Sequence, residues 1–94
     1  METNTKSLAE AIAELREEEA LKIARTLLDF GTKPIDLLDA CRQGVEVVGH
    51  RFEKGEYFLP ELMLAGEVLT QISGMVKEKM SQAPEEGVVS RLGK

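Results

Sequence analysis

The chain of 94 residues contains no tryptophan, one histidine, one cysteine, three prolines and only four aromatic side chains. A single cysteine cannot close an internal disulfide, so we expect a reducing, cytoplasmic location. No apolar run is longer than four residues, as at Tyr57–Pro60, whereas a membrane-spanning helix needs about 20. Met1–Lys6 has no apolar segment of the kind found in a secretory signal peptide.

Positive charge is also scarce. The chain has 12 Lys and Arg against 17 Asp and Glu, a formal net charge of −5, and its basic residues do not cluster. Binding to nucleic acid or to an anionic membrane surface requires a positive patch. We therefore expect neither partner, and the length allows one compact domain.

Apolar residues recur at helical spacing after Ser7, which is the expected N-cap. This first stripe ends at Leu15 and is out of phase with a second that begins at Ala20. No glycine or proline marks the change of phase, so one bent helix over residues 7–30 is an alternative. We favour two helices joined near Arg16.

Glycine and proline mark the later helix ends. Gly31 is expected to end the second helix in a left-handed conformation, and Pro34 to begin the third helix, capped by Thr32. Gly55 ends the third helix, and Pro60 lies in the first turn of the fourth. The predicted inward stripes are Leu38, Cys41, Val45, Val48 and Phe52 on the third helix, and Leu62, Met63, Gly66, Leu69, Ile72, Val76 and Met80 on the fourth.

Four amphipathic segments with short connections predict an all-α protein, an antiparallel four-helix bundle. Residues 83–94 contain proline, glycine and charge but no stripe, which is typical of a linker. Gly44 and Gly49 lie inside the third helix, where glycine is unfavourable. We therefore expect another backbone or a ligand to come close to this helix.

The chain offers few groups for catalysis or metal binding. His50 lies off the apolar stripe and is expected in solvent, whereas Cys41 lies on the stripe and is expected in the core. A zinc site needs three or four ligands, more than one His and one Cys supply. A carboxylate metal site in a bundle needs Glu three residues before His, but that position is Val47. An enzyme with a carboxylate metal site is therefore the weakest interpretation.

Aromatic residues are concentrated at one predicted turn. Three of the four lie between Phe52 and Phe58, where the third helix meets the fourth. One interpretation is that these rings close the end of the bundle. The other is that they form an apolar surface for a flat hydrophobic ligand or for a partner domain, and spacing alone leaves both open.

This segment resembles the helical cap domain of cobalamin-dependent methyltransferase corrinoid proteins, a family that includes the cobalamin module of methionine synthase. The family pattern is Val-Gly-x-x-Phe-x-x-Gly-x-Tyr-Phe-Leu-Pro-x-Leu, and Val48–Leu62 matches it. Upstream, Glu19–Pro34 is similar to the family's second helix and the turn after it. The resemblance implies a cobalamin cap domain over residues 5–82 and a linker over residues 83–94.

In that family the bundle sits over the upper face of the corrin ring, and a Phe and a Leu seven residues apart shield the methyl–cobalt bond. The resemblance assigns these positions to Phe52 and Leu59. Val48, Tyr57 and Met63 lie within a helical turn or a short loop of the pair and extend the predicted cofactor-binding set. None of the five is expected to ligate cobalt.

Family members continue into a doubly wound corrin-binding domain that carries Asp-x-His-x-x-Gly, whose His binds cobalt from below. The chain lacks this motif, because Val48 stands two positions before His50. We therefore expect cobalamin to bind only together with that domain. The expected partners are the corrin-binding domain, a methyltransferase enzyme, and a second copy of the chain through the Phe52/Leu59 end.

The implied function is that of a cap on a methyl carrier and not of an enzyme by itself. The alternative is a ligand-free helical bundle that serves in dimerisation or as a sensor input.

Overall fold

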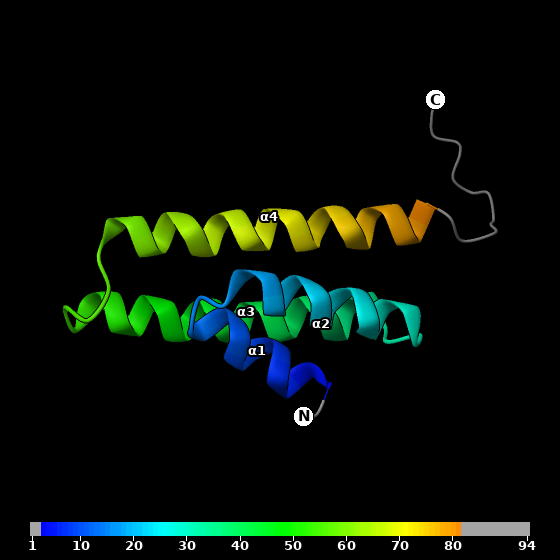
Figure 1. The fold of residues 1–94 in the computed structure, drawn as a ribbon, viewed down its shortest axis with the longest axis horizontal. Helices are drawn as coiled ribbons and strands as arrows, with labels where there is room; N and C mark the ends of the chain where they lie inside the picture. The colour runs from blue at the N-terminus through cyan, green and yellow to red at the C-terminus, as the bar shows by residue number, and fades with distance from the viewer. Residues whose placement is uncertain (1–2, 82–94) are drawn as a thin grey trace.

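The computed structural model of the chain describes residues 3–81, which form four α-helices and no strand (Figure 1). The helices are α1 (Thr5–Ala13), α2 (Glu17–Asp29), α3 (Pro34–Glu53) and α4 (Leu59–Ser81). The prediction of an all-α, four-helix chain is therefore confirmed. The segment interpreted as a linker, residues 83–94, lies outside the described residues.

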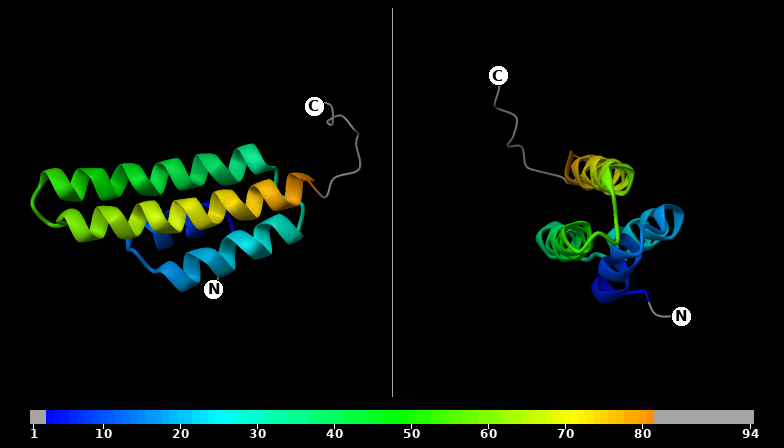
Figure 2. Two further views of the ribbon diagram at one scale, coloured as in Figure 1. Left: turned by 90° about the horizontal axis from the view of Figure 1, so that it is seen from above. Right: turned by 90° about the vertical axis from the view of Figure 1, so that its left-hand side faces the viewer.

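Successive helices run in alternating directions, so α1 and α3 point one way and α2 and α4 the other (Figure 1). Figure 2 shows α4 on one side of the α2 and α3 layer and the short α1 on the opposite side. Because of this placement, α1 packs chiefly on α3 and α2 and hardly touches α4. Each helix within residues 3–81 is too short or too polar to cross a bilayer.

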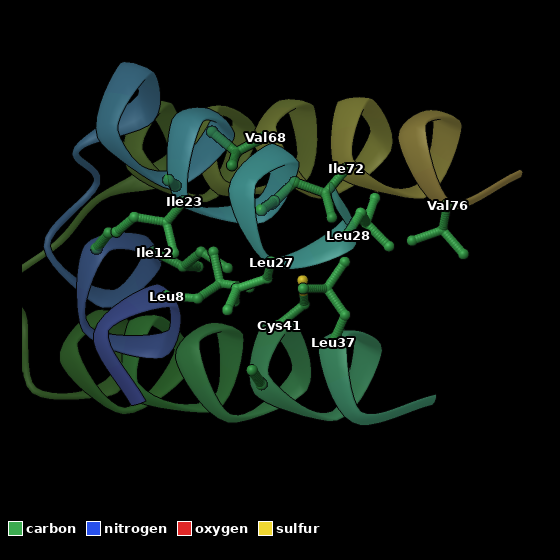
Figure 3. Close-up of a cluster of buried hydrophobic side chains, with 14 residues drawn as sticks. Leu8, Ile12, Ile23, Leu27, Leu28, Leu37, Cys41, Val68, Ile72 and Val76 are labelled. Carbon is green, nitrogen blue, oxygen red and sulfur yellow. The ribbon is translucent and has the colours of Figure 1, made fainter. Parts of the chain in front are cut away.

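The core lies between the helices, and among the described residues every buried side chain is apolar (Figure 3). Its larger members are Leu8, Ile12, Ile23, Leu27, Leu28, Leu37, Cys41, Val68, Ile72 and Val76. Such a core needs no internal hydrogen bonds, so polar interactions are left to the helix ends and the surface.

The inward face of α3 begins one position earlier than predicted. Leu37 is fully buried, whereas Leu38 is 37% exposed and Phe52 is 44% exposed. Residues 37, 41, 44, 48 and 51 follow one another in steps of four and three, which keeps them on one helix face. This face therefore ends on Arg51, and Phe52 falls outside it. The prediction that Leu38 and Phe52 point inward was wrong.

The buried face of α4 is also offset from the predicted stripe. Its buried residues are Ala65, Val68, Ile72 and Val76. Met63, Gly66 and Met80 of the predicted stripe are exposed instead. This correction leaves Met63, in the second turn of α4, available at the surface.

Gly44 explains how closely α1 and α3 pack. A Cβ atom at this position would lie 2.7 Å from the Ile12 Cβ and 2.8 Å from the Ala9 carbonyl oxygen, both on α1. Only glycine allows these two helices to approach so closely. The expected close approach of a second backbone is confirmed for Gly44 but not for Gly49, where a Cβ would meet nothing within 4 Å.

The first helix begins earlier than predicted. Asn4, not Ser7, is the N-cap: its Oδ1 accepts a hydrogen bond from the Ser7 amide at 2.8 Å, and the Asn4 amide donates to the Ser7 Oγ at 2.9 Å. This reciprocal pair is a capping box. The Ser7 prediction was wrong because Ser7 occupies the third helical position, from which its hydroxyl reaches back to the cap.

Residues 5–29 form two helices that are separated near Arg16, as predicted. Leu15 has a positive φ of 60°, and the Arg16 amide donates to the Ala11 carbonyl at 2.9 Å. Gly31 and Gly55, with φ of 93° and 81°, end α2 and α3 in the same way. The first break carried no glycine signal because leucine fills a position that glycine usually occupies. Lys33, without a side-chain cap, precedes α3, so the prediction that Thr32 caps this helix was wrong.

Candidate functional site

The turn between α3 and α4, at the left of Figure 1, has its backbone fixed on both sides. Gly55 adopts a left-handed conformation, and the Glu56 amide donates to the Arg51 carbonyl at 2.8 Å. At the start of α4, the Phe58 amide donates to the Glu61 Oε1 at 2.9 Å. These bonds close both helix ends, so the side chains around the turn are held on a defined backbone.

Four large apolar side chains are exposed around this turn, and we call them the turn surface. They are Phe52 (44% exposed), Phe58 (64%), Leu59 (61%) and Met63 (68%). Leu59 and Met63 are four residues apart on α4 and therefore share a face, whereas Phe52 lies at the end of α3. An exposed apolar group of this kind indicates contact with a ligand or with another protein.

Val48, also predicted to bind the cofactor, does not reach the turn surface. Its side chain is 0% exposed and lies in the interior one helical turn before Phe52. Phe52 is therefore exposed at the end of α3, and Leu59 and Met63 in the first two turns of α4, whereas Val48 is buried.

Tyr57 lies within the turn, but its hydroxyl is directed toward α1. The hydroxyl donates to the carbonyl oxygen of Ala13 at 2.9 Å and accepts a hydrogen bond from the Arg51 Nη1 at 3.0 Å. The guanidinium carbon also lies 5.5 Å from the centroid of the Tyr57 ring, within the range of a cation–π interaction. This predicted cofactor-binding residue thus has its polar atom engaged inside the molecule.

Arg51 extends the same set of contacts to Glu14. Its Nη2 donates to the Glu14 Oε2 at 3.0 Å, and its Nη1 lies 3.3 Å from the Ala13 carbonyl oxygen. The hydrogen bond and the charge of Arg51 lower the pKa of the Glu14 carboxyl below its usual value, and the charge of Arg16 adds to this shift. We call Arg51, Tyr57, Glu14 and the Ala13 carbonyl the Arg51–Tyr57 network.

This network could not be predicted from the sequence, because its members are distant along the chain. Arg51 and Tyr57 are six residues apart, but their partners at the C-terminal end of α1, Ala13 and Glu14, are 37 to 44 residues away along the chain. The predicted stripe through Leu38 and Phe52 did not place Arg51 on the inward face of α3. The observed face, which begins at Leu37, does.

His50 and Cys41 lie where the sequence predicted them, in solvent and in the core. The His50 side chain is 75% exposed, and its Nδ1 lies 4.0 Å from the Glu53 carboxylate. Cys41 is buried in the core, and burial raises the pKa of its thiol to about 11, which keeps it protonated at neutral pH. Within residues 3–81, His, Cys, Asp and Glu side chains do not gather in groups of three or more that could hold a metal ion.

Comparison with known proteins assigns the family. The family described as "B12 binding domain" has a sequence model that matches residues 5–77, a range that includes the turn surface and the Arg51–Tyr57 network. The chain belongs to this family. The resemblance carried by Val48–Leu62 is thereby confirmed, and we refer to the protein below as the cap domain.

Several relatives are corrinoid proteins of methylamine systems. The cap domain is 31% identical over 78 residues to trimethylamine corrinoid protein 1 of Methanosarcina acetivorans, covering 82% of this chain and 36% of the relative. It is 31% identical over 86 residues to the trimethylamine corrinoid protein of Methanosarcina barkeri, covering 86% of this chain and 40% of the relative. Monomethylamine corrinoid protein 1 of Methanosarcina mazei is 27% identical over 67 residues, which are 70% of this chain and 31% of the relative.

The cap domain thus spans less than half the length of these relatives. No solved structure matches it significantly.

Proposed function

We propose that the cap domain covers the upper face of a corrinoid held by a doubly wound corrin-binding domain, and that the turn surface is the part that faces the corrin. The observation that carries this proposal is the exposure of Phe52, Leu59 and Met63 on a backbone closed at both helix ends. When bound, the corrinoid supplies the cobalt that accepts and passes on a methyl group.

The chemistry of these side chains fits that position. Phe52 and Leu59 are hydrocarbon and cannot ligate cobalt, and the Met63 thioether is a soft, weakly polar group. Apolar cover over a reactive centre excludes water and prevents side reactions. The cap domain therefore contributes shielding and not catalysis, while the methyl donor is presented by a partner methyltransferase.

The resemblance implied that Val48 and Tyr57 contact the cofactor. In this proposal they support the turn surface instead. Val48 is buried and Tyr57 has its hydroxyl bonded to α1, so both support Phe52 and Leu59 from the protein side. Met63 remains with the pair because its side chain is exposed on the same helix face as Leu59.

The position of the turn surface sets a requirement on the connection to the next domain. α4 has 23 residues and carries the chain about 33 Å away from the turn. A corrin-binding domain that follows in sequence must therefore be reached by a segment that returns along the bundle. We propose that residues 83–94, which contain proline, glycine and charge but no apolar stripe, belong to this connection.

We place the protein in the cytoplasm as a methyl-carrier component of a corrinoid-dependent methyltransferase system. The one cysteine, which is buried in the core, and the similarity to corrinoid proteins named for methylamines support this setting.

Photolysis of bound methylcobalamin tests the proposal. The chain is joined to a doubly wound corrin-binding domain and loaded with methylcobalamin, and the loss of the methyl–cobalt absorbance is followed under light. Phe52→Ala and Leu59→Ala each remove roughly 1–3 kcal/mol of apolar contact and should accelerate the loss of the methyl group.

His50→Ala is the matched control, because His50 is exposed near the same turn but is not part of the turn surface. It should leave both the spectrum and the rate unchanged. If His50→Ala changes the spectrum while the two apolar variants lose methyl no faster than wild type, the turn surface does not cover cobalt.

A further inference from the structure

The Arg51–Tyr57 network joins the turn surface to the C-terminal end of α1. Ala13 is the last residue of α1. The last four carbonyl oxygens of a helix have no amide donor within that helix. Tyr57 and Arg51 both donate to this carbonyl, at 2.9 and 3.3 Å. A cation is also favourable at the negative end of the helix dipole, so the end of α1 is a natural anchor for Arg51.

Each anchoring side chain directly precedes a member of the turn surface. Arg51 is followed by Phe52, and Tyr57 is followed by Phe58 and Leu59. Successive positions on a helix differ by about 100°, so an inward Arg51 places Phe52 away from α1. In the same way, the inward Tyr57 hydroxyl fixes the backbone just before Phe58 and before Leu59, the first residue of α4.

We infer that Arg51 and Tyr57 are positioning residues, which hold Phe52 and Leu59 at a defined place by bonding the α3–α4 turn to α1. The inference rests on the proposed function only for what the positioned surface does, and the contacts that carry it are independent of any ligand. It also gives α1 a role at the site, although α1 lies on the side of the molecule opposite α4 (Figure 2).

Arg51 is held by more contacts than one partner of an ordinary exposed ion pair. The Arg51 side chain is 29% exposed and makes three hydrogen bonds to two other segments of the chain. A surface pair between two flexible side chains contributes little, but a guanidinium shared among a carbonyl, a phenol and a carboxylate fixes orientation as well as distance.

Local hydrogen exchange on the 94-residue chain tests this inference. Tyr57→Phe keeps the ring and removes one hydroxyl, and Arg51→Gln removes the guanidinium. Tyr57→Phe should accelerate amide exchange in the segment 54–62 by at least about fivefold, the equivalent of the roughly 1 kcal/mol net contribution of one hydrogen bond. Arg51→Gln should have the larger effect, because the guanidinium makes three hydrogen bonds. The double variant should add little to the larger single effect, because the two side chains act as one unit.

Arg42→Gln is the matched control. Arg42 lies on the same helix and pairs with Asp39 at 2.8 Å and Glu46 at 2.7 Å, but all of its bonds stay within α3. It should leave exchange in segment 54–62 unchanged. Urea unfolding of each variant separates a local effect at the turn from a general loss of stability, which would accelerate exchange throughout the core as well.

The outcomes separate this inference from the proposed function. If Arg51→Gln and Tyr57→Phe exchange like wild type at the turn, the positioning role is wrong, and the photolysis of Phe52→Ala still decides the proposed function. If the turn loosens in both variants while Phe52→Ala leaves photolysis unchanged, the positioning role stands and the proposed function fails. Support for both requires a looser turn and faster photolysis of methylcobalamin in Tyr57→Phe than in Arg42→Gln.

Discussion

At each end of the bundle a glycine with positive φ ends a helix, but the two ends differ in the side-chain contacts that hold the turn. Gly55 ends α3 and Gly31 ends α2, both at positive φ, and both ends expose aromatic side chains. At the α3–α4 end, Arg51 and Tyr57 bond the turn to α1. At the α2–α3 end, Phe30 is 81% exposed, and α3 begins without a side-chain cap.

The difference indicates why exposure alone does not identify a site. Phe30 is the most exposed large apolar residue in the part of the chain that the structure describes, so a choice by the single most exposed residue would select the α2–α3 end. The α2–α3 end has one exposed contact to α4, between Lys79 and Asp29 at 3.5 Å. The α3–α4 end is distinguished by the Arg51–Tyr57 network, with its several hydrogen bonds. A surface held in this way loses less conformational freedom when it packs against a rigid partner.

The largest expected effect comes from removing the close approach of α1 to α3. Gly44→Ala would place a Cβ 2.7 Å from the Ile12 Cβ, and we expect it to destabilise the cap domain by about 1–3 kcal/mol in urea unfolding. The substitution should also weaken the contacts of Arg51 with the end of α1, because α1 must shift away from α3. The α3–α4 end would then lose the contacts that distinguish it from the α2–α3 end. Gly49→Ala, with open space around its Cβ, is the control and should stabilise the helix by up to about 1 kcal/mol. Equal effects of the two substitutions would contradict this account of the α1–α3 contact.

A second prediction concerns assembly of the cap domain by itself. With no corrin-binding domain attached, we expect the turn surface to pair with a second copy. Phe52→Ala and Leu59→Ala should each weaken this association by about tenfold, whereas Phe30→Ala at the other end should not. Sedimentation over a range of concentrations measures the change. A strictly monomeric wild-type chain at high concentration would refute self-association.

The smallest expected effect is the pH dependence of the Glu14–Arg51 contact at the α3–α4 end. Arg51 lowers the pKa of Glu14 below its usual value near 4.5, so the ionised carboxylate stabilises the folded state. This contribution is fully present above about pH 4.5 and is lost as the pH falls through the lower pKa of the folded state. The stability of Glu14→Gln should therefore approach that of wild type on acidification. Asp39, whose pKa is also lowered, titrates in both proteins and cancels. A difference that is constant from pH 6 to pH 3 would contradict the assignment.

Much of the fold could be predicted from the sequence because its signals are local. The spacing of apolar residues predicts four helices, and Gly31, Gly55 and Pro60 mark three of their ends. The break between α1 and α2 was harder to predict, because the residue with positive φ there is Leu15 and not a glycine. The Asn4 cap was missed because Ser7, three residues later, is an equally good capping residue type.

The site was less predictable because its contacts are distant in sequence. Phe52 and Leu59 were identified by resemblance to a family pattern, and their exposure agrees with a role at the surface. That Val48 is buried and that Tyr57 bonds to Ala13 depends on how α1 crosses α3. That crossing is permitted by Gly44, and the spacing of residues within α3 does not reveal where α1 lies.

Cobalamin-dependent protection from hydrogen exchange tests the central claim most directly. The chain joined to a corrin-binding domain is compared with and without cobalamin, and exchange is followed separately in segments 50–63 and 27–38. We expect cobalamin to slow exchange in the segment 50–63, which contains the turn surface, and to leave the segment around Phe30 and Ile35 unchanged. Protection of the α2–α3 end, with none at the α3–α4 turn, would show that the cap domain faces the corrin with its other end.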